Sequence, residues 1–137
     1  MTIKLNLKEK ELQKLTARMG KKNFVRKDLV PLAERIALLY ETEMVKLAPH
    51  DKGYLENSSQ EDTRLQGGKV VSTIEFKANY AAEVHELAPH RRGTKTRAKP
   101  ATKFGVAGPK WVERVLRGMD YNYYLTRGLR RLLKEKR

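Results

Sequence analysis

The sequence predicts an α+β fold: a small antiparallel sheet packed against one long amphipathic helix, with C-terminal helices. Three observations lead to this class. An alternating apolar pattern opens the chain, one continuous apolar stripe runs through residues 28–47, and a Gly-Gly pair precedes a second alternating segment. A length of 137 residues suits a single domain with one modest core.

The first two elements differ in their apolar period. Residues 1–8 alternate between apolar and polar side chains, which is typical of a half-buried strand. From Lys8 onward the apolar residues are three and four apart. This spacing predicts a short helix over residues 9–20, ending at Gly20.

The long helix is expected over residues 28–47. Asp28 is a suitable cap, and Pro31 falls in the first turn, where a missing N–H is harmless. Pro49 disfavours helix at the residue before it and so ends the element. The apolar stripe, spaced three or four residues apart, comprises Leu29, Ala33, Ile36, Tyr40, Met44 and Leu47.

A hairpin is predicted over residues 57–77, because Gly67 and Gly68 both accept the positive φ of a tight turn. Val70, Ile74 and Phe76 are expected on one face of the outgoing strand. The incoming strand is almost wholly polar.

The last third of the chain divides into a loop and two helices. Residues 90–108 read as a long basic loop, without an apolar period that would pack it onto the domain. Residues 109–135 are expected to form C-terminal helices, with Pro109 in the first turn. Gly118 interrupts them, and Asp120 can cap the second one.

Charge is the strongest compositional signal. Thirty Lys and Arg against sixteen Asp and Glu give a net charge of +14, which favours a polyanionic neighbour or a solvated basic surface. The absence of cysteine excludes disulfides and thiolate chemistry and suits a reducing compartment. No apolar segment resembles a signal peptide or reaches membrane-spanning length, so a soluble chain without membrane contact is expected.

The segment LAPHDKG, residues 47–53, is echoed by LAPHRRG, residues 87–93. A zinc-protease motif needs two His four residues apart on one helix, whereas His85 and His90 are five apart and separated by Pro89. No phosphate-binding loop or nucleophile elbow is present in the sequence. We therefore expect that the protein is not an enzyme and binds no cofactor or metal. The repeated LAPH segment is expected to be a chance similarity between two segments that each follow a helix. A small nuclease using His85, Glu86 and His90 is the weakest alternative.

Three short motifs, in order, carry a resemblance. The first, "APHDKGYLENS", follows the long helix; "NYAAEVHE" follows the hairpin; "GPKWVERVL" follows the basic loop. From about Leu5 to Leu116, the chain resembles a family of small proteins of tailed bacteriophages. These are described as minor capsid, neck, head–tail joining or tail-completion proteins. Members carry A-P-x-D-T-G-x-L-x-x-S, matched here except for Lys52 in place of Thr, then Y-A-x-x-V-H/E-x and K-F-L-x-x-A-L. The matching residues are Ala48, Pro49, Asp51, Gly53, Leu55, Ser58, Tyr80, Ala81, Val84, His85, Glu86, Lys110, Trp111, Val112, Val115 and Leu116.

The resemblance implies a structural protein of the virion, assembled in the host cytoplasm, that joins head to tail or completes the tail. It implies a homo-oligomeric ring around the DNA channel, six-fold on the tail side, in contact with other neck and tail-tube proteins. The basic loop and the tyrosine-rich segment after Met119 depart from the family pattern.

The basic loop is the expected contact with packaged DNA or with a partner protein, and its phosphate contacts would be independent of sequence and sensitive to salt. Alone, such a loop is expected to stay mobile. The alternative function is a free-standing basic nucleic-acid-binding module, although the sequence has no recognisable binding motif. The candidate contact residues are Arg91, Arg92, Lys95, Arg97, Lys99 and Lys103.

Overall fold

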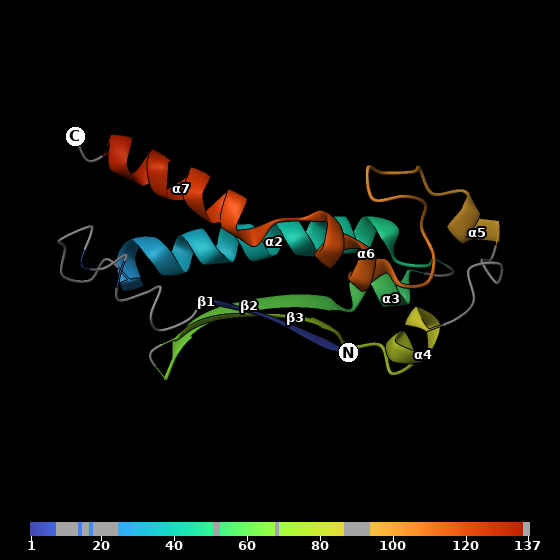
Figure 1. Ribbon diagram of the computed structural model, residues 1–137. Coiled ribbons are helices and arrows are strands. Elements are labelled where there is room, and N and C mark those ends of the chain that lie inside the picture. Colours follow the sequence, from blue (N-terminus) through green and yellow to red (C-terminus); the bar gives the residue numbers. More distant parts are fainter. Residues whose placement is uncertain are drawn as a thin grey trace.

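The computed structural model describes residues 1–7, 14, 17, 25–50, 53–67, 69–86 and 94–135. It has the predicted α+β architecture: one antiparallel sheet, one long helix and C-terminal helices (Figure 1). The short helix expected over residues 9–20 lies almost wholly outside the described residues.

The sheet contains three antiparallel strands: β1 (Thr2–Leu7), β2 (Ser59–Gln66) and β3 (Lys69–Phe76). Their order is β1-β3-β2, so the N-terminal strand pairs with the second strand of the hairpin. The predicted hairpin is confirmed, and Gly67 has the positive φ (57°) that its turn requires.

One face of the sheet carries the apolar side chains. Val70, Ile74 and Phe76 are buried on β3, as the alternation predicts, with Ile3 and Leu7 on β1 beside them. The register places Glu61 and Thr63 of β2 on the same face, opposite Ile74 and Ser72. The polar strand β2 therefore forms one border of the apolar face, at the edge of the sheet.

Helix α2 (Val30–Leu47) covers that face, and its predicted stripe is buried. It is preceded by a π-helical turn, η1 (Val25–Leu29). Asp28 lies inside this turn and the N-cap is Leu29, so the expected cap at Asp28 is wrong, whereas Pro31 does lie in the first turn. The helix ends at Leu47, as the following Ala-Pro pair predicts.

Of the C-terminal helices, α7 (Tyr121–Glu135) lies on the side of α2 away from the sheet, and α6 (Trp111–Gly118) lies alongside the C-terminal half of α2 (Figure 1). The Trp111 ring of α6 also contacts Phe76 of β3, with 5.7 Å between the ring centres. The break falls at Met119 and Asp120, directly after the predicted Gly118, which is the last residue of α6. The Asp120 carboxylate accepts the Asn122 N–H at 3.0 Å, which confirms the predicted cap. α6 begins two residues after Pro109, not at it, because Lys110 adopts a left-handed conformation (φ 63°). Helix α2 is thus packed on two sides.

Three short helices complete the described chain: α3 (Tyr54–Asn57), α4 (Ala81–His85) and α5 (Thr94–Arg97). The α3 turn starts at Gly53, whose φ of 84° is left-handed, and the Ser58 hydroxyl closes it by donating to the Leu55 carbonyl at 2.7 Å. In the described part of the chain, the helices are too short or too polar to cross a membrane.

Candidate functional site: the exposed face of helix α2 and its C-terminal end

The predicted basic contact residues fall into three groups. Arg91 and Arg92 lie outside the described residues. Lys95 and Arg97 are exposed on α5, and Lys103 is exposed with its ammonium 5.1 Å from the centre of the Phe104 ring. Lys99 differs from all of these, because its side chain is only 16% exposed.

Lys99 is inserted at the C-terminal end of α2. Its ammonium donates to the carbonyls of Val45 at 2.9 Å and Ala48 at 2.7 Å, and forms an ion pair with Glu56 of α3 at 3.1 Å. The last carbonyls of a helix lack intrahelical partners and carry partial negative charge. The largely buried Lys99 ammonium therefore gives these carbonyls a hydrogen-bond donor, and the two carbonyls and the Glu56 carboxylate compensate its charge.

Two further contacts fasten the same region. The Thr96 hydroxyl accepts the His50 N–H at 2.9 Å and donates to the His50 carbonyl at 3.1 Å, and Thr96 is buried. The Gly108 N–H donates to the Leu47 carbonyl at 2.9 Å. The expectation that residues 90–108 form a loop without packing is therefore wrong for the part from Thr94 onward. This part caps α2 through polar contacts, which an apolar period cannot reveal.

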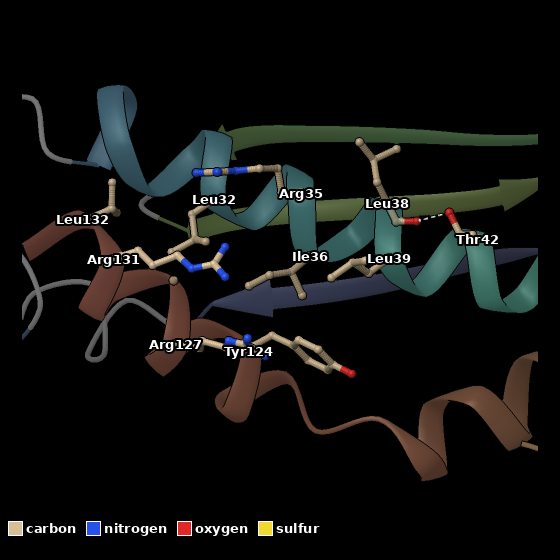
Figure 2. A pocket seen from close by; sticks show the side chains of 11 residues that line it. Leu32, Arg35, Ile36, Leu38, Leu39, Thr42, Tyr124, Arg127, Arg131 and Leu132 are labelled. Atoms are coloured by element: carbon tan, nitrogen blue, oxygen red, sulfur yellow. Dashed lines mark hydrogen bonds between the residues drawn. The ribbon is translucent and has the colours of Figure 1, made fainter. Parts of the chain in front are cut away.

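A groove runs between α2 and α7 (Figure 2). It is open to solvent, has a volume of about 690 Å³, and has a wall that combines apolar side chains with arginines. The residues that line it are Leu32, Arg35, Ile36, Leu38, Leu39, Thr42, Tyr124, Arg127, Gly128, Arg131 and Leu132.

Close contact at one end and aromatic packing at the other set the shape of the groove. A Cβ at Gly128 would lie 2.2 Å from Leu32 Cδ1, so this glycine lets α7 approach α2 closely. Toward the start of α7, the rings of Tyr121 and Tyr124 lie 6.4 Å from that of Tyr40. Burial raises the pKa of Tyr40 to about 12, so its hydroxyl stays neutral at physiological pH.

The groove exposes apolar and cationic side chains together. Leu38 and Leu39 are 43% and 49% exposed, although each lies in the middle of a helix. Figure 2 shows Arg131 reaching from α7 toward α2. In the described part of the chain, no carboxylate forms an ion pair with Arg35, Arg127 or Arg131. The Arg127 guanidinium donates to the Tyr123 hydroxyl at 3.5 Å.

The opposite border of the exposed α2 face is acidic. Glu34 and Glu41 of α2 lie near Glu61 of β2, on the helix-facing side of the sheet. Burial raises the pKa of Glu61 above its ordinary value of 4.5, and repulsion from the Glu34 and Glu41 carboxylates adds to this rise. A hydrogen bond from the Thr63 hydroxyl to Glu61 acts in the opposite direction. Repulsion among these carboxylates therefore lowers the stability of the folded protein when Glu61 is ionised.

The two described histidines occupy separate structural positions. His50 contacts Glu56 at the end of α2, and His85 is buried with its ring centre 4.8 Å from that of Trp111. Across the described residues, no three His, Asp or Glu side chains are arranged to hold a metal ion. His90, the third histidine of the nuclease alternative, lies outside the described residues.

Comparison with known protein families, curated proteins and solved structures gave no match for this chain. The apolar periodicity of the sequence predicts the buried stripe of α2 but neither the groove nor the acidic border of its exposed face. The available signal was the pair Leu38 and Leu39, which stand off that stripe on an otherwise polar face.

Replacing Lys99 by Met should loosen the C-terminal end of α2. The substitution keeps the aliphatic stem but removes the ammonium from two carbonyls and from Glu56, a loss of roughly 1.5–3 kcal/mol for hydrogen bonds of a charged group. Denaturant unfolding should report this destabilisation, and amide exchange should speed up over Thr94–Arg97. Lys103→Met, which alters an exposed cation, is the control. Equal stability of both variants would contradict the capping role.

Replacing Glu61 by Gln should stabilise the dilute protein at neutral pH. An acid whose pKa is raised by folding favours the folded state fully below its unfolded pKa and loses that effect as pH rises through its folded pKa. The variant should therefore melt above the parent at pH 7 and together with it at about pH 4. Glu83→Gln, exposed on α4, is the control. A parent that melts higher than the Glu61 variant at pH 7 would show that the acidic border is not repulsive.

Proposed function

We propose that this chain is a structural protein of a tailed-phage virion that acts at the neck. It joins head to tail or completes the tail, as one subunit of a ring around the DNA channel, after assembly in the host cytoplasm. Its role is mechanical and non-enzymatic, and it requires no cofactor.

The observation that carries this proposal is the order of the three resembling motifs on the fold. The first motif supplies the exit from α2, with Gly53 in the turn and Leu55 buried. The second supplies α4, with Ala81 and His85 buried, and the third begins α6 with the buried Trp111. Each motif lies where one element of the α+β domain begins or ends, and its matching residues include buried or turn-forming ones.

The surface supports a role in protein contacts. An open groove with exposed leucines and arginines is the kind of surface that monomeric proteins rarely leave uncovered. Aromatic and arginine side chains are also enriched where proteins bind each other. In the proposed virion, neighbouring subunits or other neck and tail-tube proteins cover such surfaces.

The exposed part of the basic segment suits the inside of a DNA channel. Lys95, Arg97 and Lys103 are exposed on a segment that Lys99 and Thr96 fasten to α2. Cations held in this way contact phosphates without reading base sequence, and salt weakens that contact. The anchored segment thus displays cationic side chains on the protein surface.

A free-standing nucleic-acid-binding module is the second candidate, favoured by the +14 charge and by the arginines of the groove. It predicts tight duplex binding by the isolated protein at physiological salt, with a steep loss as salt rises. The virion role predicts weak binding by the isolated chain, because phosphate contacts act together only in a ring.

Deletion of the gene from the phage that encodes it tests the proposed function. Electron microscopy should show DNA-filled heads and separate tails in place of joined virions, and the parent gene supplied in trans should restore joining. A variant with Lys95, Arg97 and Lys103 replaced by Ser should fold normally but join heads less efficiently or retain less DNA. Normally joined virions after the deletion, together with absence of the protein from parent virions, would contradict the proposal.

A further inference from the structure

The exposed face of α2 forms three parallel bands, here called the α2 strip. Glu34 and Glu41, two turns apart, lie on the β2 side beside Glu61. Leu38 and Leu39 are the exposed apolar residues of the centre, and Arg35 lies between them on the helix surface. On the other side, Arg127 and Arg131 project from α7 (Figure 2).

Each band is left incomplete by the described chain. The central leucines stay in contact with water, and the described residues place no carboxylate at ion-pairing distance from the strip's three arginines. No lysine or arginine forms an ion pair with Glu34, Glu41 or Glu61 in the described ranges either. A partner that completes the strip must therefore offer the same three bands in the reverse lateral order.

We propose that a second copy of this chain covers the α2 strip, face to face, about a two-fold axis parallel to α2. This operation keeps the helix direction and exchanges the two lateral sides. The acidic border of each copy then faces the Arg127 and Arg131 border of the other, and the central leucines, with Arg35 between them, meet in the middle. The contact is isologous and self-complementary, the arrangement that closes a dimer.

Other arrangements of two copies satisfy the strip less well. A two-fold axis perpendicular to α2, in the plane of the contact, places arginine against arginine and glutamate against glutamate, which is repulsive. A head-to-tail contact between the acidic border of one copy and the arginine border of the next leaves Leu38 and Leu39 in water. The parallel two-fold pairing alone covers the central leucines and matches both charged borders.

The strip has the size of a specific contact. An 18-residue helix is about 27 Å long at 1.5 Å per residue. With α7 on one side and the β2 border on the other, each roughly 10 Å wide, the strip covers on the order of 800 Å². Stable protein–protein interfaces bury about this area per partner.

The inference concerns the free protein and does not depend on the virion role. Pairing through α2 closes after two copies, so a ring requires other surfaces or the opening of this contact. A failed dimer with intact head–tail joining would reject the α2 pairing alone. A dimer without any effect of gene deletion on virions would reject the neck role alone.

Paired charge reversal tests the contact by sedimentation of the full-length protein up to about 1 mM. One variant carries Arg127→Glu and Arg131→Glu, and the other carries Glu34→Lys and Glu61→Lys. Each alone should place like charges together and weaken the dimer at least about 100-fold, since such contacts cost several kcal/mol. An equimolar mixture should restore a one-to-one dimer within about tenfold of the parent affinity, because each border again meets its opposite.

Two controls keep the test decisive. Arg97→Glu with Lys103→Glu gives the same change of net charge as the arginine variant but lies away from the strip, so it should dimerise like the parent. Leu38→Ser with Leu39→Ser should be monomeric with an unchanged far-ultraviolet circular dichroism spectrum. A monomeric parent, or a mixture that fails to pair, would overturn the proposal. A monomeric parent that binds duplex DNA, with binding lost only in the Arg127 and Arg131 variant, would reassign the arginines to phosphate.

Discussion

The packing of α2 between the sheet and the C-terminal helices is the interaction on which the rest of the structure depends. Its buried stripe, including Ile36, Tyr40 and Met44, contacts both layers at once. Each large side chain buried there contributes roughly 1.5–3 kcal/mol. Because two layers share one helix, the exposed part of α2 is narrow and bordered by β2 on one side and α7 on the other. That narrow face combines exposed leucines, arginines and glutamates.

The C-terminal end of α2 organises the second half of the chain. A helix end buried without partners would leave carbonyl groups unsatisfied at a cost of about 1–3 kcal/mol each. Here Lys99 and the Gly108 N–H reach back over more than fifty residues to supply those partners. A segment that reads as a solvated basic loop thereby becomes a fixed platform for the exposed cations Arg97 and Lys103. Within one segment, Lys99 stabilises the end of α2, whereas Arg97 and Lys103 are exposed on the surface.

Periodicity made much of the fold predictable. The stripe of α2, the Gly67 turn and the break after Gly118 each follow from the spacing of apolar residues or from the conformational freedom of glycine. The pairing of β1 with β3 was not predictable, because strand order depends on contacts about seventy residues apart. Lys99 was counted with the surface cations, since composition cannot distinguish an ammonium that caps a helix from one in water. The groove was missed for a related reason: it depends on how closely α7 approaches α2 at Gly128.

The buried side of α2 holds the fold together, and its exposed side is the surface that we propose for association. The most direct measurement is methyl NMR with a water-soluble paramagnetic agent, on leucine-labelled protein at low and high concentration. The methyls of Leu29 and Leu47 should be protected at both concentrations, because they lie in the core. Those of Leu38 and Leu39 should be strongly relaxed when the protein is dilute and protected when it is concentrated. Strong relaxation of Leu29 and Leu47 in dilute protein, or exposure of Leu38 and Leu39 that never changes with concentration, would contradict this account.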